Sequence, residues 1–358
     1  MIVLDAHCDA PSQMYRLRDF SRDNDHAQVD FPKMKRGGVD ASFFALYVPA
    51  SKEAVPAREY ALALLAETRR QVLANPGTVR FATSAEEVKK NKSEGLISIL
   101  LGLENGTPLL GADGTLEYLY EAGVRYVTLT HSADNALCDS CTGKGSWGGL
   151  SPRGREIVRE MNRIGMLVDV AHSSDDTVRD CLRLSRAPIA YTHGCCRALA
   201  SHRRDLPDAL IREIGRSGGV VGMSIYPPFL SDAFVRILDE SGLREKESLE
   251  DAFIRNPADP AARRAWFEVM DELAALPRPG VEKVVDHIEH AMEMAGPGHV
   301  GIGTDYDGIE VTAKGLETVA SLGLVFGEMR RRGWSETEIS GVAGGNFLHL
   351  LDDVRNCI

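Results

Sequence analysis

Residues 165–184 have the sequence GMLVDVAHSSDDTVRDCLRL, which is typical of one β-strand followed by one α-helix. The apolar run 166–171 predicts a buried strand, because strands of a parallel sheet are covered on both faces and appear as continuous apolar runs. Ser174 and Asp175 are typical of a helix start, and an amphipathic stretch follows them at 176–184. This segment therefore predicts one strand–helix unit of a parallel sheet.

The same unit recurs along the chain, with further amphipathic helices predicted at 153–164 and 208–216. Eight apolar runs predict strands at 2–6, 41–48, 96–103, 125–130, 166–171, 188–192, 219–225 and 300–304. Eight strands that alternate with helices favour the α/β class and a closed (β/α)8 TIM-type barrel. A doubly wound open sheet is the alternative that this pattern leaves open.

The length of 358 residues suits one barrel domain with insertions, so we expect a single domain over 1–358. The alternation of strands and helices is interrupted at 227–279, between predicted strands 7 and 8, where the chain is charged and helix-prone. We expect a helical insertion over the C-terminal rim of the barrel, acting as a lid or as an oligomer contact.

Composition excludes several classes of function. The formal net charge of -11, with no basic run longer than 330–332, argues against binding to nucleic acid. Apolar stretches are much shorter than the ~20 residues that span a bilayer, so no membrane association is expected. Seven cysteines without regular spacing argue against a disulfide framework and favour a cytoplasmic location.

Ionisable residues follow six of the eight apolar runs. They are His7, Asp9, Glu104, His131, His172, His193 and Asp305. Each residue alone also fits a structural role, such as a hydrogen-bonded core histidine or a carboxylate that caps a helix. However, the other six of the ten histidines lie in predicted loops or helices. Since the active sites of barrel enzymes lie at the C-terminal ends of strands, this clustering predicts a functional site.

The spacing of these residues points to metal ions. His7 and Asp9 are two residues apart, so a strand directs both side chains to one side, where they can bind one ion, and turns Cys8 into the barrel wall. His172 and His193 on adjacent strands can bind a second ion, which Glu104 is placed to share with the first. Histidine and carboxylate ligands suit zinc, with manganese or cobalt as possible substitutes.

Two such ions roughly 3.5–4 Å apart would lower the pKa of a shared water and polarise a substrate carbonyl, which predicts hydrolysis. Asp305 is then expected to orient the attacking hydroxide and to pass its proton to the leaving amine. The alternative is that Asp305 or Asp307 only caps the turn before Gly308.

Seven stretches resemble the membrane (renal) dipeptidase family, a metal-dependent branch of the amidohydrolase barrels. They are HCDAP, GLENG, YVTLTHSADN, VDVAHSS, YTHGCCRALASHRRDLPD, GIGTDYDG and, more weakly, GGNFLHLL. The resemblance implies two Zn²⁺ per subunit, one on His7, Asp9 and Glu104 and the other on Glu104, His172 and His193.

The resemblance also implies roles for residues around the metals. His131 would hold the scissile carbonyl or its oxyanion, and Asp305 would be the acid/base. Arg204 aligns with the arginine that binds the terminal carboxylate of the substrate, although a slip of one residue would give Arg203 instead. Tyr226 is a further candidate for substrate binding.

The metal site predicts hydrolysis, and the resemblance implies a zinc-dependent dipeptidase that cleaves L-Xaa-L-Xaa and L-Xaa-D-Xaa dipeptides by attack of a metal-bridging hydroxide. Because dimers are common in the resembling family, a homodimer is expected. One alternative is an amidohydrolase that acts on a non-peptide amide or a lactone with the same dinuclear site. Another is a non-catalytic small-molecule binding barrel with structural metals, which a lost ligand or a lost Asp305 would indicate; neither is lost.

Overall fold

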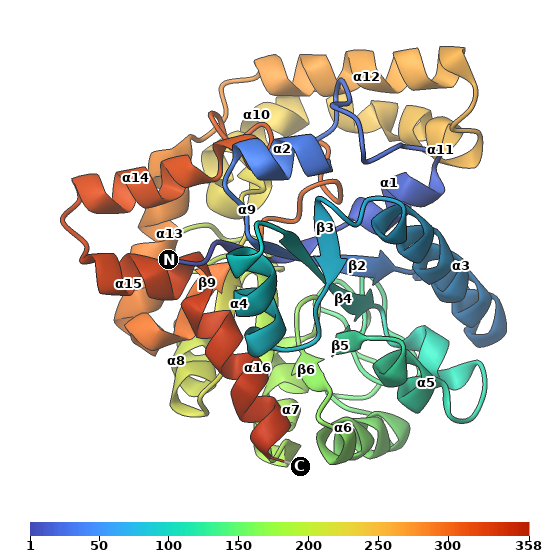
Figure 1. Cartoon of the computed structure of the whole chain (residues 1–358), viewed down its shortest axis with the longest axis vertical. Helices are drawn as coiled ribbons and strands as arrows, with labels where there is room; N and C mark the ends of the chain where they lie inside the picture. The colour runs from blue at the N-terminus through green and yellow to red at the C-terminus, as the bar shows by residue number, and fades with distance from the viewer. Residues whose placement is uncertain (358) are drawn as a thin grey trace.

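The computed structural model describes residues 1–357, with the side chain of residue 247 left out. Eight parallel strands follow one another around the sheet (Figure 1). They are β1 (Leu4–Cys8), β2 (Ala41–Tyr47), β4 (Ile97–Glu104), β5 (Val124–Thr128), β6 (Leu167–Asp169), β7 (Ala190–Gly194), β8 (Val220–Met223) and β9 (Val300–Ile302). Beyond β9, the chain returns to β1: Asp305 N donates to His7 O at 3.0 Å and Asp9 N donates to Tyr306 O at 2.8 Å. The sheet is therefore a closed barrel, as the eight apolar runs predicted.

A ninth short strand, β3 (Val79–Phe81), pairs with the first residues of β4, on Ile97–Ile99. It fits there because β5 pairs with β4 only from Leu101 onward. β3 was not predicted, because three residues with one exposed arginine do not form an apolar run.

Helices surround the barrel in Figure 1. They include α3 (Ala54–Leu73), α4 (Ala85–Ser93), α5 (Thr115–Glu121), α6 (Pro152–Ile164), α7 (Asp175–Leu184), α8 (Asp208–Arg216), α13 (Val281–Ala295), α14 (Gly323–Arg331) and α16 (Asn346–Asn356). The predicted start of α7 is confirmed, since the Ser174 side chain accepts a hydrogen bond from Thr177 N. Within residues 1–357, no helix has the length and apolarity needed to cross a membrane.

The segment between β8 and β9 forms the helices α9 (Pro227–Leu230), α10 (Asp232–Ser241), α11 (Glu247–Arg255) and α12 (Pro260–Ala275). Helices α10, α11 and α12 share an apolar cluster with Leu243, in the turn after α10, and with Val311, beyond β9, and this cluster is separate from the barrel core. Its members are Phe234, Leu238, Leu243, Phe253, Trp266, Val269, Leu273 and Val311. Phe229 and Leu230 in α9 instead belong to the main core. The segment is thus tied to the barrel at its start and packs on itself beyond.

Two junctions of the barrel have little backbone pairing, and a buried aspartate bridges each of them. β6 and β7 share one register pair, Asp169↔Ala190, and β9 meets β1 only through an isolated bridge after the strand ends. At the first junction, Asp169 Oδ1 accepts from Thr192 N at 2.9 Å and Asp169 Oδ2 accepts from Thr192 Oγ1 at 2.8 Å. At the second, Asp5 Oδ1 accepts from Thr304 N at 2.9 Å and Asp5 Oδ2 accepts from Thr304 Oγ1 at 2.6 Å. The same side-chain arrangement therefore replaces missing ladder bonds at both places.

We expect Thr304→Val to destabilise the protein, because it removes one donor to the buried Asp5 carboxylate, and the acceptor of the Tyr306 N–H, with little change of shape. Loss of a hydrogen bond to a charged group costs roughly 1.5–3 kcal/mol in the free energy of unfolding, measured by urea denaturation. Burial raises the pKa of Asp5 to about 6, although the Thr304 bonds lower it. Because the lost bond stabilises only the ionised carboxylate, the deficit relative to the parent protein should be larger at pH 8 than at pH 5.

Thr68→Val in α3 is the matched control, because Thr68 Oγ1 bonds only to Leu64 O within the same helix. An equal loss of stability in both variants, or a Thr304→Val deficit that does not depend on pH, would contradict a role for Asp5 in closing the barrel.

Candidate functional site

Glu104 lies at the centre of the site, at the end of β4, and is 2% exposed. Its Oε2 lies 3.5 Å from His7 Nε2. Its Oε1 lies 2.9 Å from His172 Nε2, 3.6 Å from His193 Nε2 and 3.8 Å from His131 Nε2. One oxygen of this carboxylate therefore faces His7, and the other faces three imidazoles that follow other strands.

His7 also approaches the other two acidic residues that the sequence analysis selected. Its Nε2 lies 3.5 Å from Asp9 Oδ2 and 3.8 Å from Asp305 Oδ1. Cys8, between His7 and Asp9, packs in the barrel core with its Sγ 3.3 Å from Ser42 Oγ. The alternation of side chains along β1 thus separates the two polar residues from the cysteine, as predicted.

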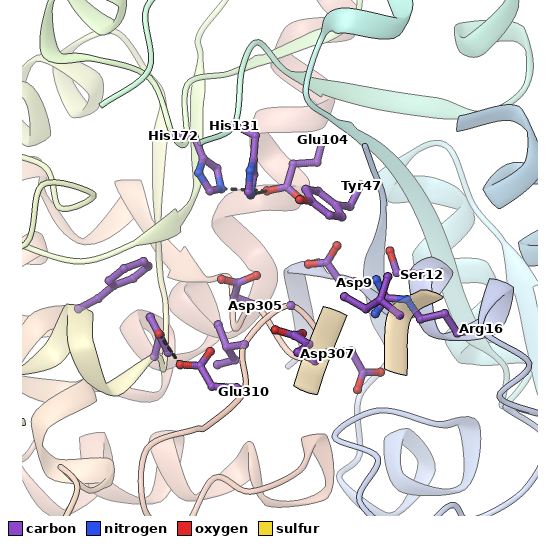
Figure 2. A pocket seen from close by; sticks show the side chains of 16 residues that line it. Asp9, Ser12, Arg16, Tyr47, Glu104, His131, His172, Asp305, Asp307 and Glu310 are labelled. Carbon is purple, nitrogen blue, oxygen red and sulfur yellow. Dashed lines mark hydrogen bonds and ion pairs between the residues drawn. The ribbon is translucent and has the colours of Figure 1, made fainter. Parts of the chain in front are cut away.

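All seven residues selected at the strand ends come together in the structure. Their possible metal-ligand atoms form three overlapping groups, and the atoms of each group lie within 4.8 Å of one another. The groups are His7–Glu104–His193, Glu104–His131–His172 and His7–Asp9–Asp305. Figure 2 shows His131, His172 and Glu104 on one side of the pocket, with Asp9 and Asp305 facing them.

Four residues at or next to the site have left-handed backbone conformations in the turns that follow β4, β6 and β9. The φ angles are 79° at Asn105, 63° at His172, 67° at Asp305 and 64° at Asp307. Asn and Asp adopt this region more readily than other residues with a side chain, whereas histidine at such a position is uncommon. The conformation of His172 is held by its neighbours, since Cys141 N donates to His172 O at 2.8 Å. Backbone strain of this kind is typical of functional sites.

The site buries three carboxylates that have no lysine or arginine partner in the described part of the chain. The side chains of Asp9, Glu104 and Asp305 are 6%, 3% and 13% exposed, and none of them pairs with a lysine or arginine of the described residues. Burial raises the pKa of Asp9 to about 6, with help from the charge of Glu104. Burial also raises the pKa of Asp305 well above its usual range, where the nearby carboxylates add to the effect and His7 opposes it. Such a concentration of buried negative charge calls for a cation.

The pKa values of the site histidines are shifted in opposite directions. Burial disfavours a charged His7, but the carboxylates of Glu104 and Asp9 outweigh it and raise its pKa well above the usual range. Burial lowers the pKa of His172 and of His193 well below that range, and the positive charge of Arg204 adds to the decrease. Neutral imidazoles are the form in which histidine binds metals.

The donor set fits divalent metal ions. His7 Nε2 and Asp9 Oδ1 are buried and have no hydrogen-bond partner among residues 1–357. Polar atoms buried without a partner are rare and need an explanation, such as a bound ion. Imidazole nitrogens with carboxylate oxygens are typical zinc ligands, and a carboxylate that faces two groups of ligands can serve two ions.

A pocket of about 330 Å³ opens above these residues and is lined by Asp9, Glu104, His131, His172 and Asp305. His7 and His193, which are fully buried, lie outside its lining. Further lining residues come from the first helix, from the end of β2, from loops and from the segment between β8 and β9. These are Ser12, Arg16, Tyr47, Tyr226, Phe229, Glu250, Ile254, Asp307, Gly308, Ile309 and Glu310.

Tyr226, a candidate from the sequence, is among these lining residues, but most of the others were not predicted. The Tyr226 hydroxyl donates to Glu310 Oε1 at 2.6 Å on one wall, while Arg16 lies at the end of α1 (Ala10–Tyr15) on another. Figure 2 shows Glu310 and Arg16 on opposite sides of Asp307. Neither Arg16 nor Glu310 follows an apolar strand, so the pattern that revealed the strand ends held no signal for them.

Arg204, like His7 and His193, is buried and does not line the pocket. Its guanidinium is buried, with Nη1 donating to Tyr191 OH at 2.7 Å and Nη2 to His193 O at 3.0 Å. Its Nε is buried and has no partner among the described residues. The guanidinium lies 5.4 Å from the ring of Phe229, which lines the pocket, whereas Arg203 is exposed to solvent.

Comparisons with known proteins agree with this fold and site. The model of the membrane dipeptidase family, peptidase family M19, matches residues 1–357. A dipeptidase of Aspergillus oryzae, aclJ, is 32% identical over 356 residues, which cover 96% of this chain and 74% of that protein. A dipeptidase of Clonostachys rogersoniana, verJ, is 30% identical over 343 residues, which cover 92% of this chain and 76% of that protein.

Solved structures have the same fold. The probable dipeptidase PvdM of Pseudomonas aeruginosa is 26% identical, with a TM-score of 0.83 over 100% of this chain and 96% of that chain. A metallopeptidase of Rhodobacter sphaeroides, solved with a phosphinate mimic of the dipeptide L-Ala-D-Ala, is 24% identical, with a TM-score of 0.81 over 99% of each chain. The family match over residues 1–357 and the identity to aclJ show that the protein belongs to the membrane dipeptidase family of metallopeptidases.

Proposed function

We propose that this protein hydrolyses the peptide bond of dipeptides of the types L-Xaa-L-Xaa and L-Xaa-D-Xaa, with two zinc ions at the base of the pocket. The position of Glu104 carries the proposal, because its oxygens lie between His7 on one side and His172 and His193 on the other. The pocket of about 330 Å³ suits a small substrate. The names of the curated relatives, which are dipeptidases, support the reaction.

In this proposal, His7, Asp9 and Glu104 hold one ion, and Glu104, His172 and His193 hold the other. Zinc suits these ligands, and manganese or cobalt are possible substitutes. When bound, the ions supply a water of lowered pKa and polarise the scissile carbonyl.

We assign proton transfer to Asp305. Its carboxyl lines the pocket, so a substrate can reach it, and its Oδ1 lies 3.8 Å from His7 Nε2. Cleavage of a peptide bond leaves an amine nitrogen that must gain a proton. A carboxyl group beside the reacting bond can take a proton from water and deliver it to that nitrogen.

His131 is assigned to the carbonyl oxygen of the substrate. Burial lowers the pKa of His131, so the ring is neutral near pH 7 and carries one N–H that can donate a hydrogen bond. The ring lines the pocket and packs against Tyr47 at 4.8 Å between centroids, which limits its orientation. A donor held in this way can stabilise the charge that develops on the oxygen during hydrolysis.

The two ends of the dipeptide carry opposite charges, and the proposal places them accordingly. The acidic side of the pocket, with Asp9 and Asp305, suits the free amine. Arg204 is assigned to the terminal carboxylate, since its Nε is an unused donor and its neighbour Phe229 lines the pocket. Tyr226 is assigned to substrate contact on the wall it shares with Glu310.

The segment 227–279 is proposed to shape the part of the pocket that contacts substrate side chains, because Glu250 and Ile254 from α11 line it. The homodimer and the cytoplasmic location expected from the sequence stay predictions.

We expect Asp305→Asn to keep both metal ions and to lose most turnover, because the amide keeps the size of the side chain but cannot relay a proton. Loss of a general acid–base group typically lowers kcat by about 10²–10⁴-fold. Metal content by mass spectrometry and kcat on a dipeptide panel check this. Asp307→Asn is the matched control, since the Asp307 carboxylate accepts two 2.8 Å bonds from Arg18. Near-normal turnover of Asp305→Asn, or an equal loss in both variants, would remove the assigned role.

Arg204→Ala should lower kcat/KM for dipeptides by about 10- to 100-fold, as expected for the loss of a charge-assisted hydrogen bond. The same variant should cleave a dipeptide amide, which lacks the terminal carboxylate, about as well as the parent enzyme does. Arg203→Ala and Arg16→Ala are measured beside it on both substrates. Equal losses on the acid and the amide would indicate general damage, and a selective loss in Arg16→Ala would move the carboxylate contact to Arg16.

A further inference from the structure

A series of buried hydrogen bonds holds the ring of His193 on its Nδ1 side. His193 Nδ1 lies 2.9 Å from Thr192 Oγ1, and Thr192 Oγ1 lies 2.8 Å from Asp169 Oδ2. His193, Thr192 and Asp169 are each at most 1% exposed. A series of this kind can fix which ring nitrogen of the histidine carries the proton.

The number of hydrogens available to Asp169, Thr192 and His193 determines which group donates and which accepts in each of these hydrogen bonds. Asp169 accepts four bonds: from Thr192 N and Ala171 N on Oδ1, and from the hydroxyls of Thr192 and Thr128 on Oδ2. Four donors fill the lone pairs of an ionised carboxylate. Because Thr192 has one hydroxyl hydrogen and gives it to Asp169, its oxygen can only accept from His193. The proton of the His193 ring is therefore on Nδ1.

The opposite side of the ring agrees with this assignment. His193 Nε2 lies 3.0 Å from His172 Nε2, a contact that requires one donor nitrogen and one acceptor nitrogen. With its proton on Nδ1, His193 is the acceptor, and its Nε2 lone pair points toward His172 and Glu104.

We propose that Asp169 and Thr192 are positioning residues that hold His193 as the Nδ1–H tautomer, with Nε2 ready to bind a metal ion. The inference rests on the proposed function only in taking His193 Nε2 as a metal ligand. Partners behind a metal-binding histidine orient its ring and raise its basicity. Since Asp169 also bridges β6 and β7, one carboxylate links the closure of the barrel to the orientation of this ligand.

His7 is held in a different way. Its Nδ1 lies 2.8 Å from the hydroxyl of Tyr126, which can either donate or accept. This hydroxyl does not impose a tautomer as the Asp169–Thr192 pair does. The effect we infer for His193 therefore does not extend to His7.

The first test reads the tautomer directly. Protein labelled with ¹⁵N-histidine is treated with a chelator, checked for folding by circular dichroism, and examined by two-bond ¹H–¹⁵N NMR, with His193→Ala used to assign the signals. An Nδ1–H pattern for His193 is expected, and an Nε2–H pattern would overturn the proposal. This measurement needs neither metal nor substrate, so it stays valid if the protein is found not to bind zinc or not to cleave dipeptides.

The second test measures zinc affinity by competition with a chelator. Thr192→Val should weaken binding of one zinc equivalent by about 10- to 100-fold, and Thr192→Ser, which keeps the hydroxyl, should restore it. Thr128→Val is the matched control, because it removes a 2.5 Å bond to the same carboxylate without touching His193. Its zinc affinity should stay close to that of the parent.

Thermal melting of each variant separates positioning from general stability. Equal losses of zinc affinity in Thr192→Val and Thr128→Val, or parental affinity in Thr192→Val, would contradict the proposal. If Thr192→Val does not fold, the tautomer of His193 in the parent protein decides the question.

Discussion

The burial of the Glu104 carboxylate among four imidazoles is the interaction on which the rest of the site depends. One negative charge, almost removed from solvent, faces nitrogen atoms from four other strand ends. Asp9 and Asp305 bring two more buried carboxylates to the same place without a lysine or arginine partner in the described part of the chain. Isolated charges of this kind are costly to bury, so the arrangement is stable only with compensating positive charge. Divalent ions between these groups satisfy that requirement.

The same side-chain hydrogen bonds join the barrel at the two junctions with the least backbone pairing, and this closure brings the site residues together. Asp5 bridges to Thr304, and Asp169 bridges to Thr192, with the same pattern of one backbone and one hydroxyl donor. Each threonine immediately precedes a site residue, Asp305 or His193. Each aspartate also lies two or three residues before a site histidine. The bonds that close the barrel are thus adjacent in sequence to the residues that the site requires.

Much of the fold could be predicted because parallel strands have a simple signature. All eight barrel strands lie at the apolar runs, although the observed strands differ by a few residues at their ends. β6 and β9 are shorter than predicted, since the chain turns at His172 and Asp305, where φ is positive, and the Asp169 and Asp5 side chains take over the hydrogen bonds. The convergence of the strand-end residues was predictable for the same reason, because carboxyl ends of parallel strands meet at one rim.

Other features depend on contacts that a sequence pattern does not contain. Arg16, Tyr47 and Glu310 line the pocket from loops and strand ends far apart in the chain. The position of Arg204 behind Phe229 depends on the packing of α9 against the barrel. The roles of Asp5 and Asp169 were hidden because a polar residue inside an apolar run gives no indication of which neighbouring strand it will bridge.

Anomalous diffraction at the zinc edge from crystals of the zinc-loaded protein tests the central claim most directly. The account predicts two zinc peaks, one beside His7 and Asp9 and the other beside His172 and His193, with the Glu104 carboxylate in contact with both. A single peak, or two peaks of which only one contacts Glu104, would contradict it.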